Sequence, residues 1–177
     1  MVCDTVNTLL DDRFAFLQHR LGASRCQKPM LPMIPLGVHV QDFEFTEQDR
    51  QQARQALGIG PHDTVIVYVG RLSFHAKAHH LPMYIALEAC VKRLSLAAPV
   101  HLVQTGWFGN DFIEQVLKSD AEQVCPSLQC HFLNGKDQQQ KKLSFAAGDI
   151  FMSLSDNVQE TFGLTPLEGM ASGMPVI

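Results

Sequence analysis

The chain contains 177 residues, of which 46% are hydrophobic and 18% are charged, and its formal net charge is −4. This length allows one domain, or one domain with part of a second, and the composition is that of a soluble globular protein. The lysines and arginines are scattered and outnumbered by acidic residues, so we expect no nucleic-acid partner.

The five cysteines do not follow the spacing of a metal site, because the one close pair lacks a second pair that would complete it. We therefore expect no metal cofactor, and free thiols in a reducing compartment. The first residues lack a basic segment followed by an apolar run, and no apolar stretch approaches the ~20 residues that span a bilayer. We expect a cytoplasmic protein without a signal peptide. The cysteines are Cys3, Cys26, Cys90, Cys125 and Cys130.

The first predicted element is a helix over residues 5–21, in which four apolar side chains recur at helical spacing and which Gly22 can end. Residues 28–40 are punctuated by prolines and read as an extended linker. We expect residues 1–34 to be the remnant of a preceding domain with its linker. Residues 35–177 then form a second domain.

From residue 47 onwards, helices and strands alternate. Thr46, followed three residues later by Asp49, predicts the start of a helix that Gly58 ends. The stretch 64–69 is β-branched and almost wholly apolar, as in a strand buried on both faces. We predict strands at residues 64–69, 100–104, 128–133, 149–154 and 175–177. We predict helices at residues 47–57, 81–96, 111–124, 138–147 and 165–172.

Repeated βα units predict an α/β fold, a Rossmann-like parallel sheet with helices on both faces. The helix over residues 81–96 should direct Leu87, Cys90, Val91 and Leu94 towards the sheet. The last residues begin a further strand, so we expect a truncated domain with an exposed, aggregation-prone sheet edge.

Ligands of such sheets bind beyond the carboxyl ends of the strands, which favours the loops at residues 70–80 and 155–165. Gly70 permits a tight turn in the first loop. Arg71 and Lys77 in the same loop can reach one phosphate group, the first as a planar fork and the second as a point charge. The alternative is a plain loop with two solvated cations.

The second loop leads into a helix whose first turn can receive an anion, because its N–H groups lack intrahelical partners. Thr165 and Glu168 have the spacing of a capping box, which is the structural alternative to a ligand role for Glu168. Glu160 is alternatively an exposed loop carboxylate. Two carboxylates also suggest glycoside hydrolysis, but both lie in one loop–helix corner rather than on opposite walls of a cleft.

Three further features stay open at this point. His75 could contact a phosphate or be an ordinary loop residue. Trp107, which follows the second strand, could line the site or cap the core. Lys141 and Lys142 lie on a predicted helix, and we expect them on its solvated face.

Together, these motifs closely resemble the donor-binding half of the retaining glycosyltransferases of family 4. The resemblance runs from about residue 32 to the end and rests on Gly-Arg-Leu-Ser with a lysine six residues after the arginine, on Asp-Ile-Phe-Met-Ser-Leu-Ser, and on Glu-Thr-Phe-Gly-Leu-Thr-Pro-Leu-Glu-Gly-Met-Ala-Ser-Gly-Met-Pro-Val-Ile. It implies the GT-B fold, in which two Rossmann-like domains face each other across a cleft. It also implies transfer of a sugar from a nucleotide-diphosphate sugar to an acceptor with retention of configuration.

By position, the resemblance implies that Arg71, Lys77 and Glu160 are the catalytic residues. The two cations would hold the donor's diphosphate, Glu160 would contact the donor sugar, and Glu168 would bond the ribose hydroxyls. The further donor-binding residues that it implies are Gly70, Thr161, Phe162, Gly163 and Leu164. Gly169 stands where the family usually has alanine, which should loosen the helix by about 0.5–1 kcal/mol.

The resemblance implies a nucleotide-sugar donor, a carbohydrate, lipid or protein acceptor, no metal, and a possible peripheral membrane contact through a domain that this chain lacks. We expect this chain alone to be inactive, because cleft closure completes such sites. Two alternatives remain, a non-catalytic nucleotide-binding module and a sugar-nucleotide epimerase or phosphorylase of the same fold. A dinucleotide dehydrogenase is disfavoured, because the first loop lacks the triple glycine.

Overall fold

The computed structural model describes residues 2–22, 32, 36–75, 78–154 and 163–177. The chain divides into two compact units, Met1–Gly37 and Val38–Ile177, and each is described by itself. The first unit contains helix α1 (Val2–Leu21), which begins three residues earlier than predicted. As predicted, Gly22 ends this helix: its φ is +85°, and its N–H donates to the carbonyl oxygen of Gln18 at 2.9 Å.

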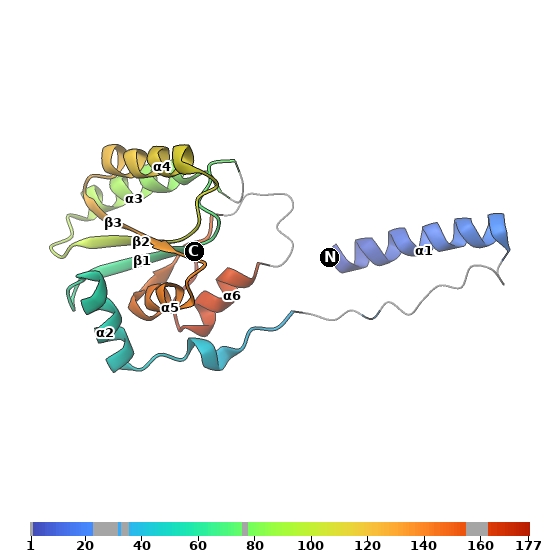
Figure 1. Ribbon diagram of the computed structural model, residues 1–177, viewed down its shortest axis with the longest axis horizontal. Coiled ribbons are helices and arrows are strands. Elements are labelled where there is room, and N and C mark those ends of the chain that lie inside the picture. Colours follow the sequence, from blue (N-terminus) through green and yellow to red (C-terminus); the bar gives the residue numbers. More distant parts are fainter. Residues whose placement is uncertain (1, 23–31, 33–35, 76–77, 155–162) are drawn as a thin grey trace. The chain divides into compact units, whose positions relative to one another are not determined.

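The second unit is built on a parallel sheet of four strands in the order β3-β2-β1-β4 (Figure 1). The strands are β1 (Thr64–Val69), β2 (Val100–Gly106), β3 (Leu128–Asn134) and β4 (Ile150–Phe151). Strand β1 lies in the middle, with β2 and β4 as its neighbours. Every residue of β2 is buried, as expected for a strand that carries helices on both faces.

Helices cover both faces of this sheet, which confirms the predicted α/β class. Helices α3 and α4 pack on one face, and helices α2, α5 and α6 lie on the other (Figure 1). Their bounds are α2 (Glu47–Leu57), α3 (His80–Leu94), α4 (Asp111–Val124), α5 (Gln138–Ala147) and α6 (Leu164–Ala171), with a short 3₁₀ helix η2 (Val40–Phe43) before α2.

The predicted bounds of α2, α4 and α5 agree with the structure, and each of these helices is capped at its start by the side chain before it. Thr46 and Asp49 form a complete capping box at the start of α2, and Gly58 ends the helix in the left-handed conformation. Asn110 and Asp137 accept backbone N–H groups at the starts of α4 and α5. Both helices therefore begin and end at the predicted residues.

The predicted inner face of α3 is partly wrong. Leu87 is buried, but Cys90 is exposed and 58% of the surface of Leu94 is exposed. The helix instead buries a more polar stripe, with Tyr84 and Glu88 beside Leu87. These polar groups can be buried because they have partners: the Tyr84 hydroxyl donates to Gln104, and Glu88 accepts from Ser127.

Strand β4 is shorter than predicted, and the last residues pair with it only briefly. At its start, the Asp149 carboxylate rather than a backbone carbonyl accepts the N–H of Val65, at 2.7 Å. At the end of the chain, Val176 forms an isolated parallel bridge with Phe151. The expected strand at residues 175–177 is therefore one bridged residue.

Gly169 on α6 faces the hydrophobic core, where the absence of a side chain matters for packing. A Cβ atom added there would lie 2.6 Å from Cγ of Phe151, whose ring is fully buried and stacks on Phe145 with centroids 5.9 Å apart. The missing side chain therefore makes room for the core, and the expected loosening of α6 is offset by the packing of Phe151.

A buried polar cluster joins the start of α3 to β2. His80 is 1% exposed, and its Nδ1 lies 2.9 Å from Oε1 of Gln104, which also accepts from the Tyr84 hydroxyl. Nδ1 must therefore carry the hydrogen, and Nε2, which has no hydrogen-bond partner in the described structure, is the bare nitrogen. Burial lowers the pKa of His80 below its ordinary value.

Within the described residues, no helix has the length and apolar character needed to cross a bilayer. Likewise, no group of three or more histidine, cysteine, aspartate or glutamate side chains in this part of the chain is placed to hold a metal ion.

Replacing Gly169 with alanine tests the packing at α6. We expect Gly169→Ala to destabilise the chain by about 1–3 kcal/mol, because overpacking exceeds the gain in helix propensity. Urea unfolding measures the change. The double variant Gly169→Ala/Phe151→Leu should recover part of the loss, since it removes the ring that the new methyl group meets. A stabilised single variant would contradict this account.

The His80 cluster predicts acid sensitivity. Below about pH 6.5, the unfolded chain binds a proton at this histidine and the folded chain does not, so the free energy of unfolding falls as pH drops and levels off below the folded pKa. Between about pH 7.5 and about pH 5.5, His80→Gln should lose less stability than the wild type in urea titrations. The exposed His62→Gln serves as control and should behave as the wild type does. Equal losses in all three proteins would refute the assignment.

Candidate functional site

The carboxyl ends of three strands continue into loops that are held together by their backbones. The N–H of Gly70 donates to the carbonyl oxygen of Thr105 at 3.0 Å, and the N–H of Gly135 donates to that of Gly106 at 2.7 Å. A Cβ atom at Gly106 would lie 1.9 Å from the carbonyl oxygen of Gly70. Only glycine fits there, and the close approach forms a continuous floor of main chain at this edge of the sheet.

Arg71 directly follows Gly70, one of the residues that form this floor. Its side chain is exposed, and its guanidinium carbon is 5.8 Å from the ring centroid of Trp107, at cation–π distance. The segments that carry the two residues also touch, because Leu72 and Phe108 form a parallel bridge. Trp107 therefore lies at the edge of the sheet where the site is predicted. Because 40% of its surface is exposed, the alternative that it caps the hydrophobic core is wrong.

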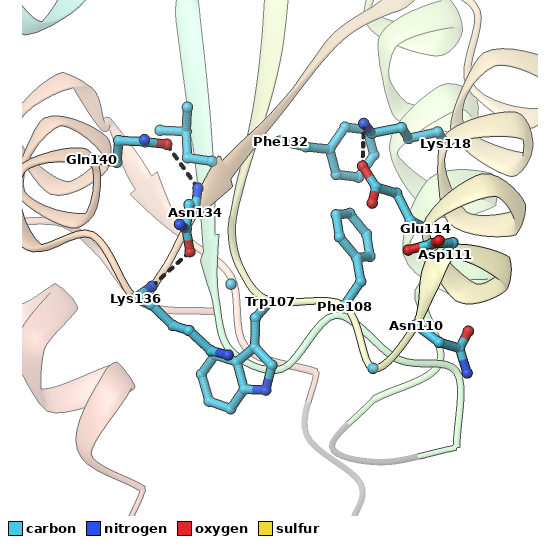
Figure 2. A pocket seen from close by; sticks show the side chains of 13 residues that line it. Trp107, Phe108, Asn110, Asp111, Glu114, Lys118, Phe132, Asn134, Lys136 and Gln140 are labelled. Atoms are coloured by element: carbon cyan, nitrogen blue, oxygen red, sulfur yellow. Dashed lines mark hydrogen bonds and ion pairs between the residues drawn. The ribbon is translucent and has the colours of Figure 1, made fainter.

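A pocket of about 570 Å³ opens beside Trp107, between the loops that follow β2 and β3. In Figure 2, Asn134, Lys136 and Gln140 form one wall, Phe108, Glu114 and Lys118 form the opposite wall, and Trp107 lies between them. The remaining lining residues are Gly106, Gly109, Asn110, Asp111, Phe132 and Leu133.

Both walls of the pocket are held by internal contacts. On one side, Gln140 Oε1 accepts the N–H of Asn134 at 2.8 Å, and Asn134 Oδ1 accepts the N–H of Lys136 at 3.0 Å. On the other side, Lys118 donates to Glu114 at 2.6 Å and lies over the ring of Phe108. The pocket thus combines the aromatic surface of Trp107 and Phe108 with a larger share of amide and charged groups.

The second predicted part of the site begins at Gly163. This glycine is the N-cap of α6, with a φ of +56°, and Leu164 is the first helical residue. The N-cap is Gly163 rather than Thr165 and makes no side-chain cap hydrogen bond, so the predicted capping box between Thr165 and Glu168 is wrong. Because β4 is parallel to β1, the loop that leads to α6 leaves the sheet at the same edge as the loop with Arg71.

Glu168 binds a lysine rather than its own helix. Lys141 Nζ lies 2.9 Å from each carboxylate oxygen and donates its hydrogen bond to Oε1, while the buried Oε2 has no hydrogen-bond partner in the described structure. Lys141 also lies over the rings of Phe43 and Phe145. It is thus a partly buried contact between α5 and α6, and the expectation that it lies on a solvated face is wrong.

Four predicted site residues lie outside the described residues, and the remaining ones are placed as above. Lys141 was missed by sequence reasoning, because its partner is twenty-seven residues away and no local pattern links them. His75 lies in the described part of the first loop, with Nδ1 3.1 Å from the hydroxyl oxygen of Ser73. The four residues that the structure does not describe are Lys77, Glu160, Thr161 and Phe162.

Comparison with known proteins gives a consistent family. Residues 49–177 match the family described as glycosyl transferases group 1. Among curated proteins, the chain is 28% identical over 153 residues to a D-inositol 3-phosphate glycosyltransferase of Corynebacterium urealyticum, covering 85% of this chain and 35% of the relative. It is 27% identical over 180 residues to a protein of the same name from Mycobacterium sp. strain KMS, covering 97% and 36%. The chain thus spans about a third of the curated relatives it matches.

Solved structures share the fold. HepE of Anabaena, solved in complex with UDP and glucose, superposes with a TM-score of 0.63 and 24% identity, over 79% of this chain and 35% of HepE. The C-terminal domain of LpcC, a group 1 glycosyl transferase family protein of Francisella tularensis, superposes with a TM-score of 0.51 and 23% identity, over 79% of this chain and 69% of that chain. The described fold is therefore that of the C-terminal half of such enzymes.

Removing the amine of Lys141 tests the contact between α5 and α6. We expect Lys141→Met to destabilise the chain by about 1–3 kcal/mol, because it leaves a largely buried carboxylate without its charged partner. The neighbouring Lys142→Met removes an exposed amine and should change stability by less than about 0.5 kcal/mol. Chemical denaturation of both variants provides the comparison. Equal effects would show that the pair with Glu168 contributes nothing.

Proposed function

We propose, from the premise that this chain belongs to the group 1 glycosyltransferase family, that it is the donor-binding domain of a retaining glycosyltransferase. The substrate is a nucleotide-diphosphate sugar, and the sugar passes to an acceptor held by the remainder of the enzyme. The observation that carries this proposal is the position of Arg71, which is exposed and lies 5.8 Å from the ring centroid of Trp107, a residue that lines the pocket. Arg71 follows β1, whose parallel neighbour β4 precedes α6.

Arg71 and Lys77 bind the diphosphate of the donor. Negative charge gathers on this group as the bond to the sugar breaks, so the transition state requires fixed positive charge. A charged hydrogen bond contributes roughly 1.5–3 kcal/mol, and the N-terminus of α6, which begins after Gly163, adds up to ~2 kcal/mol. Glu160 and the backbone of residues 161–164 contact the sugar. These groups supply the positive charge without a metal ion.

The pocket beside Trp107 takes the nucleoside. The indole offers a face for a base, and the amide and amine groups of Asn134, Lys136 and Gln140 offer hydrogen bonds. Glu168 binds the ribose hydroxyls. Lys141 Nζ lies 2.9 Å from both carboxylate oxygens and would hold this acceptor in place for the hydroxyl donors of the ribose.

The relatives support the substrate class. HepE is solved with UDP and glucose, and the curated relatives are named as glycosyltransferases of D-inositol 3-phosphate. Because this chain spans about a third of those relatives, the acceptor is bound by a part of the enzyme outside it. Transfer requires both parts, since closure of the cleft excludes water from the donor.

Turnover of the complete enzyme tests this proposal. We expect Arg71→Ala and Lys77→Ala each to reduce kcat at least tenfold, as the loss of one charged contact to the leaving group requires. Arg93→Ala removes an exposed arginine at the far end of α3 and should leave kcat unchanged. Products from labelled UDP-glucose, GDP-mannose and ADP-glucose identify the reaction and its stereochemistry. Unchanged kcat in both site variants, or an epimerised or phosphorylated sugar as product, would refute the assignment.

A further inference from the structure

Two thiols lie side by side on the face of the sheet that α3 and α4 cover. Cys125 caps the C-terminus of α4, and Cys130 is the third residue of β3. Their Sγ atoms are 3.7 Å apart. Both are free cysteines, and Cys90, a further free cysteine, is exposed on α3.

The connection between the two cysteines is short and firmly held. The N–H of Leu128 donates to the carbonyl oxygen of Cys125 at 3.0 Å and closes a turn. Within that turn, the N–H and the hydroxyl of Ser127 donate to the two carboxylate oxygens of the buried Glu88, at 3.0 and 2.9 Å. These hydrogen bonds fix the backbone of the turn, and the separation of the two thiols therefore depends on the turn as well as on the side-chain rotamers.

Hydrogen bonds also orient the two sulfur atoms. Cys125 donates to the carbonyl oxygen of Ala121 at 3.1 Å, so its lone pairs are free to accept from Cys130. The hydrogen bond from Cys130 lowers the pKa of the Cys125 thiol, and the same bond together with burial raises the pKa of Cys130.

A cavity of about 350 Å³ gives access to the pair. It is separate from the pocket beside Trp107, although Lys118 and Phe132 line both. Cys125 itself is fully buried and Cys130 is partly exposed. The other residues around the cavity are Ala121, Glu122, Pro126 and Leu128.

We propose that Cys125 and Cys130 form a reversible disulfide by exchange with a small disulfide RSSR. The thiolate of one cysteine attacks a sulfur atom of RSSR, which breaks the S–S bond and releases RS⁻. The second cysteine then attacks the resulting mixed disulfide, forms the bond between Cys125 and Cys130, and releases a second RS⁻. Two electrons pass from the protein to RSSR, and the two thiol protons end on the two RSH molecules.

The bond would join the end of α4 covalently to β3. In a reducing compartment the pair remains a dithiol, as in the described structure, and it closes when small disulfides accumulate. Because the two sulfur atoms are already in contact at 3.7 Å, we expect the cross-link to form in the native fold and to stabilise it by restricting the unfolded chain. The site does not depend on the proposed sugar transfer, and its test can succeed or fail independently.

Oxidation of the native chain tests this inference. The folded protein is incubated with 2-hydroxyethyl disulfide, quenched by alkylation and mapped by mass spectrometry. We expect the peptide that carries Cys125 and Cys130 to lose two hydrogens and both alkylation sites, and to regain them with dithiothreitol. The oxidised protein should also have a higher thermal midpoint than the reduced protein.

Three variants sharpen the result. Cys90→Ser should still form the cross-link, whereas Cys125→Ser and Cys130→Ser should lose it and retain only a mixed disulfide. The mapping of the wild type does not depend on whether these variants fold. If Cys125 and Cys130 both stay alkylatable under conditions that fully modify Cys90, or if they bond to Cys3 or Cys26 instead, the inference is wrong.

Discussion

The ion pair between Arg54 and Asp149 fixes the amino ends of β1 and β4, the strands that precede the loop with Arg71 and the helix α6. Arg54 on α2 is 4% exposed, and its Nη2 lies 2.7 Å from Asp149 Oδ2, which also accepts the N–H of Val65 at the start of β1. Since β1 and β4 are thereby aligned at their starts, the loops with Arg71 and Gly163 leave the sheet side by side. The other donors of Arg54 reach the carbonyl oxygens of Ala147, Gly60, Pro61 and Asp63.

The fold could be predicted from the sequence wherever its cause is local. Thr46 with Asp49 marks the start of α2, and the apolar stretch at residues 64–69 defines β1, because a cap and a doubly buried strand each depend on neighbouring residues only. The inner face of α3 could not be predicted in the same way. Tyr84 and Glu88 face inward because Gln104 and Ser127 offer partners, and those partners come from other elements.

The sequence predicts where a site should lie, but it does not predict the contacts that the structure shows there. A parallel sheet places ligands at its carboxyl edge, and this rule alone selected the loop with Arg71. The cation–π contact between Arg71 and Trp107 joins two loops that are far apart in sequence, so no spacing in the sequence indicates it. The pattern Thr165-Pro-Leu-Glu168 predicted a capping box that the structure does not contain. The pattern fits a capping box, but in the structure Glu168 binds Lys141 on another helix, and no local pattern shows that partner.

The floor beneath the candidate site is made of main chain. The shape of the floor therefore depends on backbone contacts, whereas the chemical groups above it are side chains. Gly70, Gly106 and Gly135 touch through backbone atoms, so the position of the floor does not depend on any side chain above it. Trp107 and Lys136 project from that floor and can be exchanged without moving it. Substitutions at such side-chain positions can therefore change the chemistry of the candidate site, provided that the three glycines are retained.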